Sequence, residues 1–277
     1  SLLGRVARVS SARIEPQFDL AFIGAGKMAE AMLGGIMKRG FVDAKGVVIY
    51  DPEEKRVSHF QQEFGVVAAE SVQHAVQDAQ TVILSCKPQN LGNVFATCHG
   101  RLTPGALVVS ICAGVTVEQL IQGLAADAVV RSMPNTPATI QRGVTVWTGT
   151  ESMTEAQRAQ AAELLSCFGR EIFVADESFL DMATALSGSG PAYFLMLMEA
   201  MIETGVHMGF PRDIATELVQ QTAVGTSELA IASEMHPAVL RNDITSPGGT
   251  TAAANYALER GNFRTIVADG VWAAYRR

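Results

Sequence analysis

Short β-rich runs alternate with amphipathic stretches of helical length through the first half of this chain of 277 residues. Since the helix between two such runs carries the chain back to the same edge of a sheet, this order builds a parallel sheet with helices on both faces. We therefore predict a doubly wound α/β domain. Strands are expected at residues 20–24, 47–51, 81–86, 106–112, 129–132, 144–147 and 171–174, and helices at residues 28–39, 53–64, 90–99, 117–124 and 155–168.

The second half loses these strand signals after about residue 177 and is predicted to be entirely helical. Helices are expected at residues 193–208, 212–234, 237–243, 251–259 and 263–275. We accordingly expect an N-terminal arm over residues 1–17, an α/β domain over 18–177 and an all-α domain over 178–277. Arginines and serines without acids in residues 1–14 are typical of either a targeting segment or a plain arm.

The helix expected within residues 192–209 is apolar on nearly every face, with Leu195, Met196, Met198 and Val206 spread around it. A surface helix of a monomer would have a polar face. A domain of about 100 residues buries such a helix most easily against a second copy of itself, so we expect a homodimer. The alternative is a central helix wrapped by its own neighbours.

A glycine motif follows the first strand and opens the first helix, which is the position of a dinucleotide fingerprint. Its sequence, 24-GAGKMA-29, matches G-x-G-x-x-A. Gly24 allows a tight turn, Gly26 lets a pyrophosphate approach the backbone, and Ala29 permits close helix packing. The phosphates are expected to face the helix N-terminus. We predict an NAD or NADP site that includes Gly24, Ala25, Gly26, Lys27 and Met28.

Asp51 ends the second strand and is followed by Pro52. An acid at this position accepts hydrogen bonds from the adenosine ribose and repels a 2′-phosphate, which favours NADH. Two alternatives stay open. Lys55 and Arg56 could approach a 2′-phosphate, and Asp51 could be only a turn residue before the proline.

Two loops at later strand ends are expected to border the nicotinamide, because ligands of open α/β sheets lie over the carboxyl ends of the strands. They are Ser85-Cys86-Lys87-Pro88 and Ile111-Cys112-Ala113. Lys87 is the charged residue of these loops. It could contact the cofactor, or it could be a solvated loop lysine without a functional role.

Two loops of small residues, 186–193 and 245–251, precede helices in the second half. Hydroxyls and unpaired backbone N–H groups at a helix start are suited to binding a carboxylate. The alternative is that they are ordinary helix starts capped by Ser or Thr.

Composition excludes several partners. The net charge of −7 disfavours nucleic acid, and the longest apolar stretch, residues 191–202, is shorter than the roughly 20 residues of a membrane span. The five histidines lie far apart in sequence without helical pairing, so no metal site is expected. The four cysteines form no C-x-x-C pair, which is typical of a reducing compartment, and we expect a cytoplasmic protein.

The sequence resembles pyrroline-5-carboxylate reductases from residue 20 to its end. The resemblance lies in FIGAGKMAEAMLGG at 22–35, CKP at 86–88, VVSICAGVT at 108–116, RSMPNTPA at 131–138, LSGSGPAY at 186–193, HPAVLRND at 236–243 and SPGGTT at 246–251. It implies a Rossmann domain followed by an all-α dimerisation domain, whose dimers can associate further. The implied reaction is reduction of 1-pyrroline-5-carboxylate to L-proline with NAD(P)H, the final step of proline biosynthesis.

The same resemblance implies which residues form the site. The substrate carboxylate is held by Ser246, Gly248, Gly249, Thr250 and Thr251, with Glu177 near the substrate and Asp243 near the cofactor. Three departures from the family pattern bear on the cofactor. Some members have Asn in place of Asp243, and an asparagine that in some members helps hold the ribose or its phosphate is missing near residues 71–72. Members also commonly prefer NADPH, whereas Asp51 of this chain argues against that preference.

Reduction of a C=N bond needs a positioned hydride donor and a fixed substrate, and positioning alone can supply about 7 to 11 kcal/mol in model reactions. A protonated iminium needs no strong acid, so we assign Thr251 as the catalytic residue that hydrogen-bonds the ring nitrogen. Two alternatives remain. The first is another β-hydroxyacid dehydrogenase-like enzyme or imine reductase. An enzyme of the β-hydroxyacid dehydrogenase-like group is expected to have a catalytic lysine on a helix of the second domain, and residues 192–210 contain no lysine. A non-catalytic NAD(P)-binding protein would keep the fold without turnover.

Overall fold

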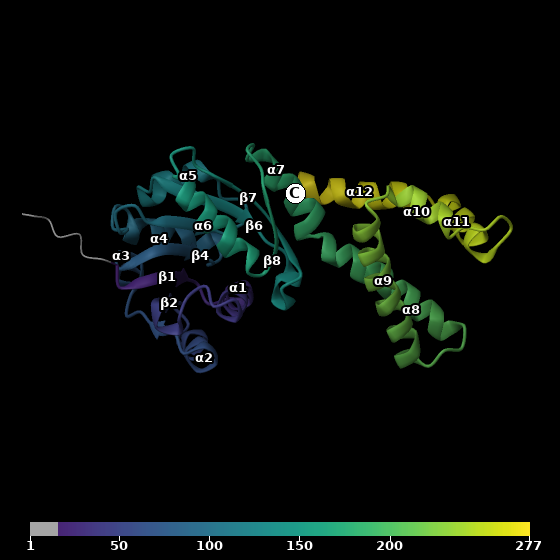
Figure 1. Ribbon diagram of the computed structural model, residues 1–277, viewed down its shortest axis with the longest axis horizontal. Coiled ribbons are helices and arrows are strands. Elements are labelled where there is room, and N and C mark those ends of the chain that lie inside the picture. The colour runs from purple at the N-terminus through teal and green to yellow at the C-terminus, as the bar shows by residue number, and fades with distance from the viewer. Residues whose placement is uncertain (1–15) are drawn as a thin grey trace, which may run out of the picture. The chain divides into compact units, whose positions relative to one another are not determined.

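The computed structural model describes residues 16–277, so nearly all of the expected N-terminal arm lies outside the described residues. The chain divides into two compact units, with the boundary between Leu180 and Asp181 (Figure 1). The first unit contains every strand of the described chain and the second is helical.

The first unit is built on one sheet of eight strands in the order β3-β2-β1-β4-β5-β6-β7-β8. The strands are β1 (Phe18–Ile23), β2 (Val47–Tyr50), β3 (Val67–Ala68), β4 (Ala79–Leu84), β5 (Leu107–Ser110), β6 (Ala128–Met133), β7 (Gly143–Gly149) and β8 (Gly169–Phe173). All neighbours pair in parallel except β6 and β7, which are antiparallel. The order reverses direction at β1, as in a doubly wound Rossmann sheet, and the predicted fold class is confirmed.

Helices follow the strands in the expected alternation. They are α1 (Lys27–Lys38), α2 (Glu54–Phe64), α3 (Val72–Gln77), α4 (Leu91–Cys98), α5 (Val117–Leu124) and α6 (Glu155–Ser166), with short 3-10 turns η1 (Ala44–Gly46), η2 (Pro88–Asn90) and η3 (Thr136–Ile140). Each of the longer helices begins within one residue of its expected start. Capping boxes fix two of these starts, at Thr116 before α5 and at Thr154 before α6.

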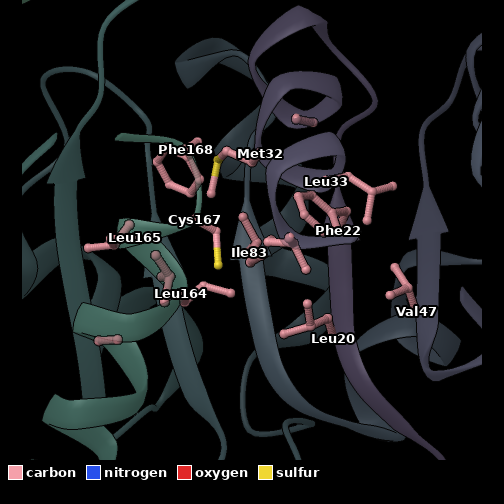
Figure 2. Packing of buried hydrophobic residues seen from close by; sticks show 14 of the residues in the cluster. Leu20, Phe22, Met32, Leu33, Val47, Ile83, Leu164, Leu165, Cys167 and Phe168 are labelled. Carbon is pink, nitrogen blue, oxygen red and sulfur yellow. The ribbon is translucent and has the colours of Figure 1, made fainter. Parts of the chain in front are cut away.

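The sheet is covered on both faces, and alternate residues of β1 belong to two different cores. Leu20 and Phe22 pack with α1 and α6 in one core, which Figure 2 shows from close by. Ala21 and Ile23 pack with α3, α4 and α5 in the other. Side chains of a strand alternate between faces, so a central strand must be apolar at every position, as β1 nearly is.

Elements that were not expected include the strand β3 and the helix α3. The strand has two residues, too few for a periodic signal, and it sits at the edge of the sheet beside β2. The helix has six residues and is held at its start by Ser71, whose hydroxyl accepts a hydrogen bond from the backbone N–H of His74 at 3.2 Å.

The second unit begins within α7 (Ser178–Ala183). It continues with a π-helical turn η4 (Thr184–Gly188), α8 (Gly190–His207), α9 (Arg212–Ser233), α10 (Pro237–Asp243), α11 (Thr250–Arg260) and α12 (Phe263–Arg276). Helix α8 packs on α9, and Gly205 makes room there, since a Cβ at this position would lie 3.2 Å from the Cβ of Ala215. Helix α12 packs on η4.

The expectation of a loop with exposed N–H groups at residues 186–193 is wrong. Residues 184–188 form the π-helical turn, and Ser189 has helical dihedral angles and donates its N–H to the carbonyl of Thr184 at 2.9 Å. Small residues here continue a helical path into α8 instead of starting a helix from a loop. A widened turn accommodates the one extra residue per turn that a π-helix contains.

The second unit has almost no core of its own within one chain. Its buried apolar side chains are small: Ala183, Ala185, Ala215 and Val219. Large apolar side chains of α8 are exposed instead, with Leu195 at 63% and Met196 at 71%. Within a single chain, the neighbouring helices therefore do not bury α8, so the alternative of a central helix wrapped by its own neighbours is wrong.

Candidate functional site

The glycine loop between β1 and α1 is fixed by contacts with the ends of two neighbouring strands. Gly24 has φ of +111°, and a Cβ there would lie 2.6 Å from the backbone nitrogen of Cys86. The Gly24 N–H donates to the carbonyl of Tyr50 at 2.8 Å, and the Ser85 hydroxyl donates to the carbonyl of Gly24 at 2.7 Å. A residue with a side chain would neither adopt this φ nor fit against the β4 end, so the turn requires glycine.

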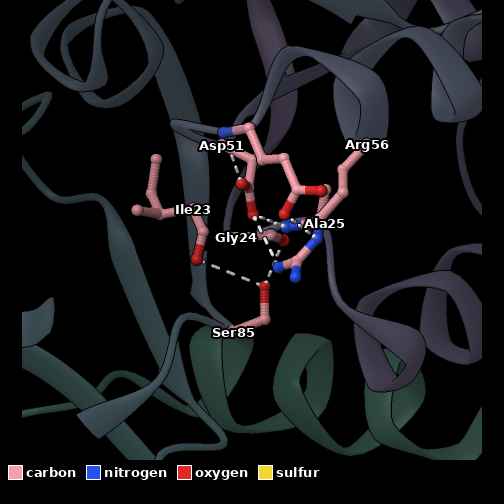
Figure 3. Close-up of polar contacts among 7 residues, drawn as sticks. Ile23, Gly24, Ala25, Asp51, Arg56 and Ser85 are labelled. Carbon is pink, nitrogen blue, oxygen red and sulfur yellow. Dashed lines mark hydrogen bonds and ion pairs between the residues drawn. The ribbon is translucent and has the colours of Figure 1, made fainter. Parts of the chain in front are cut away.

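Asp51 ties the end of β2 to the same loop. Its Oδ2 accepts a hydrogen bond from the Ala25 N–H at 2.8 Å, and its Oδ1 accepts one from the Glu53 N–H at 2.9 Å (Figure 3). The carboxylate is 6% exposed. The two sequence interpretations of Asp51 are thus compatible: it stabilises the turn before α2 and it also faces the glycine loop.

Arg56 lies beside this carboxylate. Its Nη1 is 3.7 Å from Asp51 Oδ2, and its Nε forms an ion pair of 2.8 Å with Glu53. The side chain is 43% exposed, and it is the arginine that the structure brings to the end of β2. Two carboxylates offset its charge in this arrangement.

A cavity of about 580 Å³ opens over the carboxyl ends of β1, β2 and β4. It brings together seven of the residues predicted to bind cofactor: Gly24, Gly26, Asp51, Pro52, Ser85, Cys86 and Lys87. At Gly26 nothing lies within 4 Å of the place a Cβ would take, so a ligand can approach the backbone closely. The volume falls within the range of about 300 to 1,000 Å³ typical of small-molecule sites.

The other predicted residues of this region lie at or near the same sheet edge without lining the cavity. Ala25 meets the Asp51 carboxylate, and the remaining ones are the first residues of α1 and residues of the loops after β4 and β5: Lys27, Met28, Pro88, Ile111, Cys112 and Ala113. Several residues that line the cavity were not predicted from the sequence: Tyr50, Val72, Gln73, Asn90, Asn93, Val94 and Thr97. Val72 and Gln73 come from α3, and the cap at Ser71 was the available signal for that helix.

Two cysteine thiols meet at the ends of β4 and β5. Cys112 is buried, and its Sγ lies 3.2 Å from the carbonyl oxygen of Cys86. A hydrogen bond between the two thiols lowers the pKa of Cys86, while the same bond together with burial raises the pKa of Cys112. Cys86 is therefore the more acidic thiol of the pair.

Glu177 forms a partly buried ion pair with Arg131 on β6. Its Oε1 accepts from Arg131 Nη1 at 2.8 Å and from the backbone N–H of Val117, the first residue of α5, at 2.9 Å. The guanidinium side chain is 7% exposed and that of Glu177 is 33% exposed. One carboxylate oxygen thus links a central strand to the start of α5.

In the second unit, the residues 246–251 form a tight turn into α11. Gly248 has φ of +71°, and the Gly249 N–H donates to the carbonyl of Ser246 at 3.0 Å. Gly249 occupies the N-cap position without a side-chain cap, so the alternative of a Ser or Thr cap does not describe this helix start. Thr250 and Thr251 are the first two residues of α11 and Asp243 is the last residue of α10.

Within residues 16–277, no three His, Cys, Asp or Glu side chains converge in a way that could hold a metal ion. None of the helices in that region has the length and hydropathy needed to cross a membrane. The fold and the cavity together define a class: a Rossmann-type, dinucleotide-binding oxidoreductase with a helical second domain.

Comparison with known proteins makes the assignment specific. The family description "Pyrroline-5-carboxylate reductase dimerisation" matches residues 177–277, and "NADP oxidoreductase coenzyme F420-dependent" matches residues 19–114. A pyrroline-5-carboxylate reductase of Pseudomonas aeruginosa is 40% identical over 259 residues, which cover 93% of this chain and 94% of that protein.

Solved structures agree. A pyrroline-5-carboxylate reductase from Coxiella burnetii superposes with a TM-score of 0.87 at 31% identity, covering 94% of this chain and 97% of the other. The Plasmodium falciparum enzyme, solved with NADP bound, gives a TM-score of 0.85 at 27% identity over 94% of this chain and 97% of the other. This chain belongs to the pyrroline-5-carboxylate reductase family, and its second unit is the dimerisation domain of that family.

Proposed function

We propose that this protein reduces 1-pyrroline-5-carboxylate to L-proline with NAD(P)H, the final step of proline biosynthesis. The single observation that carries the proposal is the 40% identity to a pyrroline-5-carboxylate reductase over 93% of the chain. The cavity at the glycine loop supports it, because Gly26 leaves the backbone open to a pyrophosphate at the start of α1. When bound there, the reduced nicotinamide supplies the hydride.

For the cofactor, we propose NADH as the preferred form and NADPH as an accepted one. Asp51 places a carboxylate at the end of β2, where a 2′-phosphate would meet like charge. Arg56 is the cation available to a 2′-phosphate, but in this arrangement it is paired with Glu53 at 2.8 Å. Accepting NADPH would require Arg56 to leave that pair.

For the substrate, we propose that its carboxylate binds the turn formed by Ser246, Gly248, Gly249, Thr250 and Thr251. Support comes from the start of α11, where backbone N–H groups of a helix N-terminus favour an anion. Gly249 holds the N-cap position of α11 and Thr251 is the second residue of the helix. We assign the Thr251 hydroxyl to the ring nitrogen, where it would stabilise the developing amine.

We retain Glu177 as a candidate group near the substrate and Asp243 as a candidate contact of the cofactor. The pairing of Glu177 with Arg131 and with the N–H of Val117 fixes its carboxylate in one position, as a positioning role requires. Asp243→Asn, which the family resemblance suggests as a tolerated change, should leave turnover with saturating NADH within a fewfold of the wild type.

We also propose that the protein is a homodimer whose interface includes α8, and that such dimers can associate further. The exposed Leu195, Met196 and Phe194 of α8 and the lack of large buried side chains in the second unit support this proposal. A unit with so small a core gains the apolar burial it needs from a partner. The free thiols fit a reducing compartment, and we propose the cytoplasm.

Turnover with purified protein tests the function. We expect 1-pyrroline-5-carboxylate to cause loss of the absorbance of NADH or NADPH, with proline as the product. Oxidation of neither cofactor would overturn the proposal. If NADH binds but no substrate is reduced, the protein is a non-catalytic dinucleotide-binding member, and if only other imines or hydroxyacids react, it is an enzyme of a related specificity.

A further inference from the structure

Cys86 and Cys112 stand opposite one another at the ends of two adjacent parallel strands. The β4 and β5 register pairs Leu84 with Ser110, and each cysteine lies two residues beyond its strand's paired residue. Paired neighbouring strands run about 4.8 Å apart, so if this register continues for two residues, the two Cα atoms come within the separation of about 4.4 to 6.8 Å that a disulfide requires. The Sγ of Cys112 already lies 3.2 Å from the carbonyl oxygen of Cys86.

The two thiols differ in access. Cys86 is half-buried and lines the cofactor cavity, whereas Cys112 is buried behind it. The hydrogen bond from the Cys112 thiol lowers the pKa of Cys86, and the thiolate is the form that reacts with oxidants. Burial instead raises the pKa of Cys98 to about 11 and raises that of Cys167, so these two thiols are less reactive.

We propose that Cys86 and Cys112 form a modification site in which hydrogen peroxide converts the thiol pair to a disulfide at the wall of the cofactor cavity, and that bound cofactor prevents this reaction. The Cys86 sulfur attacks one peroxide oxygen, the O–O bond breaks, and a sulfenic acid and one water form. The Cys112 sulfur then displaces the hydroxyl of that sulfenic acid, forming the S–S bond and releasing a second water. Two thiols are oxidised and one peroxide is reduced.

The site is mechanically linked to the glycine loop. Gly24 packs directly on the backbone of Ser85 and Cys86, so that a Cβ on Gly24 would lie 2.8 Å from the Cα of Cys86. Drawing the two cysteine loops together to S–S bonding distance therefore moves the surface against which the dinucleotide turn is packed. Coupling between two sites is reciprocal: if cofactor disfavours the disulfide, the disulfide weakens cofactor binding by the same factor.

The experiment uses the full-length Cys98→Ser variant, because Cys98 shares a tryptic peptide with Cys86. Trypsin does not cleave Lys87 before Pro88, so cleavage yields residues 57–101 with Cys86 and residues 102–131 with Cys112. The protein is treated with hydrogen peroxide, blocked with a maleimide and mapped by mass spectrometry, with and without NADH. Cys86→Ser and Cys112→Ser in the same background are the matched controls.

We expect the two peptides to be joined with loss of two hydrogens, and the link to be reversed by a dithiol reductant and absent from both controls. With NADH at about 100 times its Kd, roughly one molecule in 100 has an empty cavity, so disulfide formation should slow about 100-fold. A dead-end sulfenic acid on Cys86, a disulfide between chains, or no oxidation would overturn the proposal.

NADH binding is also titrated directly, so that the effect of NADH on the rate of oxidation can be compared with its measured affinity. If NADH binds and does not slow the reaction, the coupling to the cofactor is wrong. The coupling part of this inference rests on the proposed function, but the disulfide does not. Absence of NADH binding together with disulfide formation would therefore refute the proposed function and support the modification site alone.

Discussion

Replacing Gly24 and Gly26 with alanine, one at a time, tests whether the two glycines of the loop have different physical roles. At Gly24 a Cβ would lie 2.6 Å from the nitrogen of Cys86 and 2.7 Å from the carbonyl carbon of Ser85, both backbone atoms. At Gly26 nothing lies within 4 Å of the added atom, and the dihedral angles, φ −85° and ψ 176°, are open to alanine. The first change strains the fold, and the second only narrows the approach to a ligand.

The magnitudes follow from these contacts. Alanine at φ of +111° costs about 1 to 2 kcal/mol for its backbone, and the forced movement of the β4 end costs about 1 to 3 kcal/mol more. We expect Gly24→Ala to lose about 2 to 5 kcal/mol of unfolding free energy, which lowers Tm by roughly 4 to 20 °C. Gly26→Ala should change stability by less than about 1 kcal/mol, because no native contact is disturbed.

Gly26→Ala should weaken cofactor binding without lowering stability, whereas the main effect of Gly24→Ala is on stability. A methyl group in the space left for the pyrophosphate costs about 1 to 3 kcal/mol, so Gly26→Ala should raise the Kd of NADH roughly 5- to 150-fold with an unchanged Tm. Thermal melts and NADH fluorescence titrations on the three proteins measure both quantities. Equal melting of the two variants, or wild-type NADH affinity in Gly26→Ala, would refute this division of roles.

Four further changes have expected outcomes. Asp51→Ser should shift the ratio of kcat/KM values toward NADPH, because it removes the charge that repels a 2′-phosphate, as initial rates with both cofactors would measure. Glu177→Gln should lower unfolding free energy by about 1 to 3 kcal/mol, since it weakens a charged hydrogen bond to the buried Arg131, as denaturant titration would measure. Leu195→Glu should bury a carboxylate at the proposed interface and release monomers in sedimentation. Thr251→Ala should lose roughly 10- to 150-fold in kcat/KM with an unchanged Tm.

Three of these four changes have a result that would contradict the reasoning. An unchanged cofactor ratio would leave Asp51 with its structural bonds alone, and an intact dimer of the Leu195 variant would move the interface off that face of α8. For the threonine, Thr251→Ser is the matched control, since it keeps the hydroxyl and should recover most of the rate. A fully active Thr251→Ala enzyme would remove this side chain from the reaction.

The strand and helix order of the first unit was predictable because burial on both faces of the sheet requires recognisable patterns of apolar residues. Each central strand of a doubly wound sheet needs apolar residues at successive positions, as in Ala21, Phe22 and Ile23, and each crossover helix needs one apolar side. The glycine loop was predictable for a similar reason. Gly24 meets a backbone requirement that only glycine satisfies, and Gly26 leaves the space that we propose a pyrophosphate fills, so their spacing is specific.

Other features depend on contacts that no local pattern encodes. The antiparallel direction of β7 follows from a connection through η3, and the strand itself has the same alternation in either direction. The small residues at 186–189 have the composition of a loop, yet the contact of α12 with η4 accompanies a π-helical turn there. The ion pair of Arg131 with Glu177 joins residues 46 positions apart, and neither residue alone indicates it.

If Asp51 sets the cofactor preference as proposed, that preference and the stability of the glycine loop cannot be changed independently. Its carboxylate accepts backbone hydrogen bonds from Ala25 in the glycine loop and from Glu53 at the start of α2, and it is almost fully buried. Serine retains an acceptor but is too short to reach both N–H groups, so a change made to admit a 2′-phosphate also leaves a donor of the dinucleotide turn without its partner, at about 1 to 3 kcal/mol. Asparagine has the same reach without the charge, but its one carbonyl oxygen accepts from only one of the two N–H groups, and its Nδ2 is a donor that faces the other. Asp51→Asn should therefore also relax the cofactor preference and should lose a similar amount of stability, since it too leaves one N–H without its acceptor. Wild-type stability in both variants, measured by thermal melts, would mean that these hydrogen bonds do not hold the loop.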